Sequence, residues 1–139
     1  MKVKSQKSLV RTNGENDVVD VTDMVASSVS DSGMSEGTAT VFVVGSTAAV
    51  TTLEFEPGLV KDLPAMLERV SPKGARYEHQ KTWSDNNGHS HIRAALIGPS
   101  LCVPFNKGAL SLGVWQQIVL IELDVRPRER TIVIQVIGE

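Results

Sequence analysis

Residues 114–125 read VWQQIVLIELDV, and residues 130–139 read RTIVIQVIGE after the short segment RPRE. Both runs are rich in β-branched and aliphatic residues, which favour extended strands. They are the clearest strand signals in the chain. We therefore expect both to belong to a largely antiparallel β-sheet.

Weaker strand signals precede these two runs. KVKSQKSLVRT, residues 2–12, alternates weakly and predicts a first strand. Residues 38–44 and 50–55 are β-branched and aromatic runs with a break at Gly45 between them, and they predict two adjacent strands. SLCVPFNKGAL, residues 100–110, is typical of a short strand and a turn.

Two segments favour helices. Residues 24–32, MVASSVSDS, fit a short helix that Thr22 or Asp23 would cap. Residues 59–70 place apolar side chains at helical spacing. Pro64 lies within that second segment, and we expect it either to begin the main helix or to kink it.

The segment IRAALIG, residues 92–98, is compatible with either a helix or a strand. The total is many strands with two or three short helices. We expect an α+β fold in which residues 1–139 form a single compact domain with a largely antiparallel, sandwich-like β-sheet.

Composition narrows the class of protein. A chain of 139 residues with 41% hydrophobic and 22% charged residues can bury a core as one domain. Its net charge of -2 argues against a general nucleic-acid binder. Cys102 is the only cysteine and lies among apolar residues, so we expect an inert core thiol. With neither a signal peptide nor a membrane-spanning run, we expect a soluble, cytoplasmic protein.

All three histidines, His79, His89 and His91, lie in the polar segment YEHQKTWSDNNGHSHIRAALIG, residues 77–98. If this segment is extended, His89 and His91 share one face, and His79 could join them. In a helix the pair would lie about 200° apart and could not easily share a ligand. Three imidazoles could bind a divalent metal such as zinc or magnesium. An acid–base or anion-binding role without metal, and a chance cluster, remain open.

The second group of candidate residues follows the apolar run. Glu122 lies inside that run, where a buried carboxylate needs a cation, a metal or a donor, unless it simply faces solvent. Arg126, Arg128 and Arg130 alternate, which in an extended segment puts three guanidinium groups on one face. Such groups suit phosphate or carboxylate, but the pattern by itself favours a solvated edge strand that its charges protect.

Several motifs taken together resemble the YjbQ-like family. They are a Tyr-x-His element, an Asn-x-x-x-His element, Gly-x-Leu-x-Leu-Gly-x-Trp-Gln, and a Glu-x-Asp run that ends in arginines. The resemblance extends from about residue 5 to the end of the chain. It implies a compact α+β domain that associates as a homotrimer. The matching positions are His79, Asn87, His91, Gly98, Gly108, Gly113, Trp115, Gln116, Glu122 and Asp124.

Members of this family are described as uncharacterised proteins or as secondary thiamine-phosphate synthases. The implied activity joins a hydroxymethylpyrimidine diphosphate to a thiazole phosphate and expels pyrophosphate. It requires stabilisation of the departing phosphate charge, by arginines or a divalent cation. The family often has a histidine at the start of a His-Thr-Ser-Ala-like element, where this chain has GSTAA with Ser46. His89 could be a local substitute for that histidine.

The resemblance and the residue patterns together give a candidate site for a small phosphorylated metabolite. The alternatives are a non-catalytic metal- or ligand-binding trimer, and residues that only stabilise the fold. The expected catalytic residues are His79, His91, Glu122 and Asn87; the expected metal ligands are His79, His89 and His91; the expected substrate-binding residues are Gln116, Trp115, Arg126, Arg128, Arg130 and Lys107.

Overall fold

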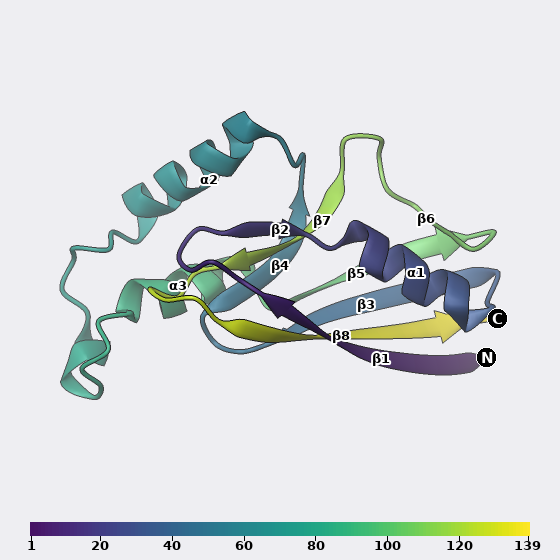
Figure 1. The fold of residues 1–139 in the computed structure, drawn as a ribbon, viewed down its shortest axis with the longest axis horizontal. Coiled ribbons are helices and arrows are strands. Elements are labelled where there is room, and N and C mark those ends of the chain that lie inside the picture. The colour runs from purple at the N-terminus through teal and green to yellow at the C-terminus, as the bar shows by residue number, and fades with distance from the viewer.

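The computed structural model describes residues 1–139 and contains both helices and strands, which confirms the expected α+β class. Figure 1 shows the chain with its two termini at one end. In chain order the elements are β1 (Lys2–Arg11), β2 (Val18–Asp20), α1 (Thr22–Ser32), β3 (Glu36–Val44), β4 (Ala48–Leu53), α2 (Pro57–Val70), the 3-10 helix η1 (Glu78–Lys81), α3 (Gly88–Ile97), β5 (Ser100–Asn106), β6 (Ala109–Leu110), β7 (Gln117–Glu122) and β8 (Glu129–Gly138).

The strands form two sheets in which every pair is antiparallel. The first, sheet A, has the order β1-β8-β3-β5-β6, and the second, sheet B, has the order β2-β7-β4. The two strongest strands of the sequence, β7 and β8, therefore lie in different sheets, and residues 123–128 carry the chain from one sheet to the other.

Strand β7 is buried on both faces, which explains its continuous apolar run. Ile118 and Leu120 join the larger core cluster, between sheet A, sheet B and α1. Val119 and Ile121 join the smaller cluster, where Leu67 of α2 and Ala94 of α3 pack against sheet B. Sheet B is thus the middle layer, with sheet A packed on one of its faces and α2 and α3 packed on the other.

The first two helices form where the sequence predicts them, but their ends differ from expectation. No side chain caps the N-terminus of α1, while Gly33 ends it in the left-handed conformation with φ of 69°. In α2, Glu56 accepts hydrogen bonds from the backbone N–H groups of Gly58 and Leu59. The helix therefore starts at Pro57, and Pro64 lies inside it rather than beginning it.

The segment that carries His89 and His91 is the start of α3, so the helical alternative holds and the shared face that an extended segment would have given the two histidines does not form. Ala94 packs into the smaller core cluster, and Ile97 packs against it. Burial of this face against sheet B stabilises the helix in a segment with weak local preference. The two histidines consequently point to different sides of α3.

The outer face of sheet A carries no covering layer. In β5, Val103 and Phe105 point into the core, so the alternating positions point outward. Cys102 is one of these and is exposed, which corrects the expected core thiol. No helix of the structure is long and apolar enough to cross a membrane.

The sheet leaves no room for a side chain at Gly37. A Cβ atom there would lie 2.0 Å from the carbonyl oxygen of Ile137, and the residue has a φ of 154°. We expect Gly37→Ala to lower the free energy of unfolding by about 2–4 kcal/mol, measured by urea denaturation. Gly74→Ala is the control, because no atom lies within 4 Å of its Cβ position. Equal stability of the two variants would contradict this account of the packing.

Candidate functional site

A buried ion pair joins the end of β7 to the start of β8. Glu122 is fully buried, and the Nε of Arg130 donates to its Oε2 at 2.8 Å. The hydroxyl of Thr12 donates to the same oxygen at 2.8 Å. Glu122 therefore has the cationic partner that its place in an apolar strand required, and it does not face solvent.

Thr47 extends this network toward the surface. Its hydroxyl accepts from Nη2 of Arg130 at 2.7 Å and donates to Oδ2 of Asp124 at 3.1 Å. The Nε of Arg128 donates to the same Asp124 oxygen at 2.8 Å. Asn87, which precedes α3, donates from Nδ2 to Oδ1 of Asp124 at 3.3 Å. One chain of hydrogen bonds therefore runs from the core to the start of α3.

Asp124 stays ionised in this setting. Burial by itself raises the pKa of Asp124, but hydrogen bonds from Arg128, the backbone N–H of Val125 and Asn87 outweigh burial, so the net pKa is lowered. An ionised carboxylate only accepts hydrogen bonds, so the amide nitrogen of Asn87 must face it. The carboxylate fixes both Arg128 and Asn87 in place.

Two of the three histidines meet beside this network. The ring centroids of His79 from η1 and His91 from α3 lie 4.5 Å apart with an interplanar angle of 55°. Nε2 of His79 lies 3.6 Å from Oδ1 of Asp85 and has no hydrogen-bond partner. Burial lowers the pKa of His91, and the neighbouring His79 lowers it further. His91 is therefore neutral at physiological pH and can accept a proton.

Two cavities adjoin the histidine pair, and together with it they form what we call the histidine site. One has a volume of about 310 Å³ and is lined by small residues and one imidazole: Gly45, Ser46, Ala48, His91, Ala94, Ala95 and Pro99. The other has a volume of about 180 Å³ and is lined mainly by polar residues: Asp85, Asn87, Asp124, Val125, Arg126 and Arg128. A mostly apolar compartment and a charged compartment thus flank the imidazoles.

His89 is not part of the histidine site. It is almost fully buried, and its Nε2 lies 2.6 Å from Oε1 of Glu15, in the β1–β2 connection. Burial raises the pKa of Glu15, but Lys73 and His89 together lower it. The helical geometry of α3 turns His89 away from His91, so His89 ties a connection to α3 and does not replace the missing family histidine.

The expected metal set is not assembled for the same reason. The structure contains no group of three or more His, Cys, Asp or Glu side chains that could hold a metal ion. The expected set of His79, His89 and His91 is divided between the two sides of α3. Zinc sites use three or four protein ligands, and the histidine pair offers two imidazoles.

The expected substrate-binding residues divide in a similar way. Arg126 and Arg128 line the charged cavity, and Arg126 has no acidic partner. Arg130 is committed to Glu122 inside the fold. Trp115, exposed on the loop before β7, and Gln116, which donates to Thr52 at 3.2 Å, lie at the opposite end of β7 from Glu122. The sixth, Lys107, lies in the β5–β6 turn.

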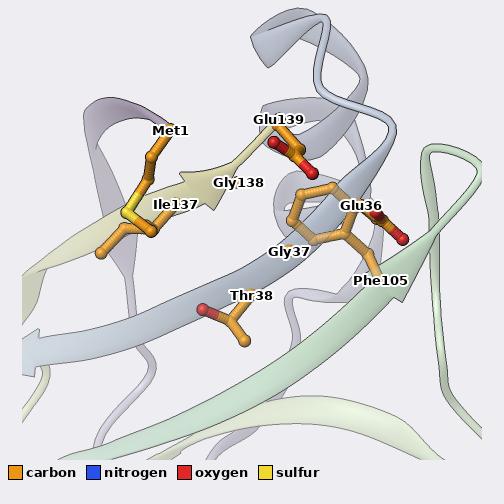
Figure 2. A pocket seen from close by; sticks show the side chains of 8 residues that line it. All are labelled: Met1, Glu36, Gly37, Thr38, Phe105, Ile137, Gly138 and Glu139. Atoms are coloured by element: carbon orange, nitrogen blue, oxygen red, sulfur yellow. The ribbon is translucent and has the colours of Figure 1, made fainter.

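The largest cavity, of about 570 Å³, lies elsewhere, beside the chain termini. Figure 2 shows Phe105 and Thr38 at this cavity, with the carboxylates of Glu36 and Glu139 near by. It contains neither imidazole nor guanidinium, and its charged side chains are two carboxylates, which disfavour an anionic ligand. We therefore place the candidate site at the histidines.

Sequence reasoning matched Asp124 to a family position without giving it a role in the site, and it omitted Thr12 and Thr47. Asp124 follows Glu122 by two positions, and this spacing could have identified it as a second carboxylate of the same face. Thr12 and Thr47 carry no such signal. They reach Glu122 and Asp124 across 110 and 77 positions of sequence, so only folding brings them there.

Removal of one partner of the buried ion pair should be costly. Arg130→Met leaves Glu122 with a buried charge and without its cation, so we expect a loss of about 3–5 kcal/mol in the free energy of unfolding. The double variant Glu122→Leu with Arg130→Met should lose less, because no charge remains buried alone. Urea denaturation measures the free energy of unfolding of both variants. A double variant less stable than Arg130→Met would contradict the explanation by an unpaired buried charge.

The titration of His91 provides a second test. In NMR titrations we expect its pKa below 6.5, and His79→Gln should raise it without restoring the full value, because burial remains. Since the folded pKa is lower than the unfolded one, the neutral ring contributes stability above pH 6.5 that is lost as pH falls through the folded pKa. An unchanged His91 pKa in His79→Gln would contradict the coupling.

Comparison with known proteins places this geometry in a family. The profile of the family described as UPF0047 protein YjbQ-like matches residues 6–139. A UPF0047 protein of Methanothermobacter thermautotrophicus is 40% identical over 139 residues, which cover 100% of this chain and 95% of that protein.

Solved structures agree with this match. The crystal structure of a YbjQ-like protein of unknown function from Sulfolobus solfataricus P2 has a TM-score of 0.92 and 34% identity, over 99% of both chains. A hypothetical protein from Aeropyrum pernix K1 has a TM-score of 0.89 and 35% identity, over 98% of this chain and 99% of that one. The chain therefore belongs to the UPF0047, YjbQ-like family.

Proposed function

We propose that the histidine site binds a small phosphorylated metabolite and catalyses a transfer reaction on it. The observation that carries this proposal is that a neutral imidazole, His91, lines the mostly apolar cavity of the histidine site, while an unpaired guanidinium, Arg126, lines the charged cavity of the same site. A base and an anion-binding group within one site are what a reaction of a phosphorylated substrate requires.

The charged cavity supplies the anion-binding half. Arg126 is exposed and free of ion pairs, so its planar guanidinium can bind phosphate oxygens in pairs. Arg128 is held by Asp124 and keeps part of its side chain open to solvent. The buried network positions this second arginine, so a phosphate group would meet one unpaired cation, Arg126, and one held in place, Arg128.

The imidazole pair supplies the acid–base half. His91 lines the mostly apolar cavity and is neutral at physiological pH, so it can take a proton from a substrate held there. His79 lies against it, and Asp85 lies close enough to His79 to stabilise a proton on that ring. Asn87 and Glu122 do not contact the substrate and instead hold other side chains in place. Asn87 donates a hydrogen bond to the Asp124 carboxylate, and Glu122 accepts one from Arg130.

The specific reaction that we propose is that of a secondary thiamine-phosphate synthase. The nitrogen of a thiazole phosphate would form a bond to the methylene carbon of a hydroxymethylpyrimidine diphosphate while the bond from that carbon to the pyrophosphate oxygen breaks. His91 would take a proton from the amino group of the pyrimidine as pyrophosphate leaves and would return it to the product. Arg126 and Arg128 would stabilise the charge on the departing pyrophosphate, and the small-residue cavity beside His91 has room for a planar ring. No step in this proposal depends on a metal.

The proposal also includes the assembly and setting of the protein. We propose a homotrimer in the cytoplasm that acts on a small metabolite and has neither a nucleic-acid nor a membrane partner. The uncovered outer face of sheet A supports the homotrimer. The net charge of -2 supports the absence of a nucleic-acid partner.

Inorganic pyrophosphate is the probe for the anion-binding half. We expect Arg126→Gln to weaken its binding at least about tenfold in isothermal titration calorimetry, because the free guanidinium contributes charge-assisted hydrogen bonds. Arg69→Gln, which removes an arginine from the last turn of α2, is the control and should bind as the wild type does. Equal affinity of Arg126→Gln and the wild type would contradict the anion site.

The acid–base half is tested by turnover. We expect His91→Gln to reduce the rate of thiamine phosphate formation about 10²–10⁴-fold while pyrophosphate still binds. The assay uses the pyrimidine diphosphate and the thiazole phosphate as substrates. Pyrophosphate binding without turnover in the wild type would contradict the proposed reaction but not the anion site.

A further inference from the structure

We infer that Glu15 is a positioning residue that sets the distance between His91 and the two arginines of the charged cavity. Glu15 lies in the β1–β2 connection, residues 12–17, and both arginines lie in the segment between β7 and β8, residues 123–128, which we call the crossing segment. The effect of Glu15 on turnover rests on the proposed function. Its effect on geometry does not depend on that function.

The β1–β2 connection supports the backbone of the crossing segment. The backbone N–H of Thr12 donates to the carbonyl oxygen of Arg128 at 2.8 Å, and the N–H of Arg128 donates to the hydroxyl of Thr12 at 3.0 Å. Gly14 packs against the peptide bond between Arg126 and Pro127, where a Cβ atom on Gly14 would lie 3.4 Å from the nitrogen of Pro127. The connection therefore determines where the backbone of both arginines lies.

Glu15 joins this connection to the helices. Its Oε1 lies 2.6 Å from Nε2 of His89, and its Oε2 accepts from Nζ of Lys73 at 2.6 Å. Burial raises the pKa of Glu15, but Lys73 and His89 together lower it, so the carboxylate is ionised. An ionised carboxylate only accepts, so Nε2 of His89 carries the proton of a short, charge-assisted hydrogen bond.

Two contacts join the N-terminal turn of α3 to the crossing segment. Asn87, directly before α3, donates to Asp124 at 3.3 Å. A single hydrogen bond of this length does not by itself fix how the helix is rotated about its axis. His89 provides the second contact, through Glu15 and the β1–β2 connection. The two contacts together specify one orientation of α3 relative to the arginines.

The other buried cation of α3 joins it to α2 instead. Arg93 donates from Nε to the carbonyl oxygen of Ser71, just after α2, at 3.0 Å, and it pairs with Glu68 of α2. Ala94 packs on sheet B, but apolar burial is non-directional and specifies a rotation less sharply than hydrogen bonds do. Without Glu15 the two helices would stay joined to each other and lose their polar link to the β1–β2 connection.

A small rotation of α3 would matter at His91. A helix with its side chains has a radius of about 5–6 Å, so a rotation of about 10° moves a side chain by about 1 Å. A misplacement of about 1 Å between reacting groups can lower a rate on the order of 100-fold. His91 would act on a substrate whose phosphates the crossing segment holds, so the distance between them must be kept. Glu15 keeps that distance from outside both cavities.

Turnover and pyrophosphate binding separate a positioning role from a purely structural one. In Glu15→Ala we expect kcat for thiamine phosphate formation to fall about 10–100-fold. Pyrophosphate should bind within about twofold of the wild-type affinity, because Thr12 still holds the crossing segment. Glu15→Gln keeps an oxygen that accepts from His89, so its kcat should stay within about threefold of the wild-type value.

Glu68→Ala is the matched control. It also removes a carboxylate that pairs with a buried side chain of α3, but that carboxylate comes from α2 and not from the β1–β2 connection. It should lower the melting temperature and leave kcat unchanged. Glu15→Asp, which withdraws the charge from His89 by one methylene, replaces Glu15→Ala if circular dichroism shows that the latter is unfolded.

Three results would overturn the positioning role. They are a wild-type kcat in Glu15→Ala, a loss of kcat in Glu68→Ala as large as that in Glu15→Ala, and a loss in Glu15→Gln as large as that in Glu15→Ala.

Crystal structures of the wild type, Glu15→Ala and Glu68→Ala give a readout that needs no substrate. With residues 123–128 superposed, we expect the ring of His91 to move by about 1 Å or more in Glu15→Ala, and by about half that or less in Glu68→Ala. An unmoved ring in Glu15→Ala would overturn the inference even if kcat fell. A moved ring together with a wild type that shows no turnover would instead contradict the proposed reaction and leave the positioning of His91 by Glu15 standing.

Discussion

The buried ion pair between Glu122 and Arg130 is the constraint on which the rest of the site depends. Two charges inside a core cost several kcal/mol each in lost hydration, and they are tolerated only where geometry and further hydrogen bonds satisfy them. Thr12 and Thr47 supply those bonds. They come from the end of β1 and from the β3–β4 connection, so the charge pair ties both sheets together. From Thr47 the network continues to Asp124, whose carboxylate then fixes groups at the surface. These hydrogen bonds therefore hold in place the part of the site that the two sheets and residues 123–128 provide.

The helical conformation of α3 decides which histidines can act together. His89 and His91 are two positions apart, and in a helix this spacing puts them on different sides. One side receives Glu15 and a buried hydrogen bond, and the other receives His79 and a cavity. The same residue type consequently has a structural role at one position and is available for chemistry at the other.

Much of the fold follows from the sequence. The apolar runs that became β7 and β8 have strong strand preference, and the carboxylate of Glu122 within such a run required a partner. The alternation of Arg126, Arg128 and Arg130 left open an anion site and a charged edge strand. In the structure the three side chains have three different environments, because residues 123–128 leave the sheet before β8 begins. Cys102 was placed in the core from its apolar neighbours, although period-two alternation directs every second residue of a strand outward. The composition around Cys102 does not tell which alternate residues of its strand face the core and which face outward.

The sequence by itself determined the α+β class, the positions of the main strands and the gathering of polar and ionisable residues between Tyr77 and Ile97, because propensity and periodicity are local properties of the chain. The tertiary structure alone decided which of those residues meet. Packing of α3 on sheet B set the direction of each histidine, and closure of the two sheets brought Thr12 and Thr47 to the buried charges. Contacts between residues a hundred positions apart depend on how whole elements pack, and no short pattern along the chain encodes that packing.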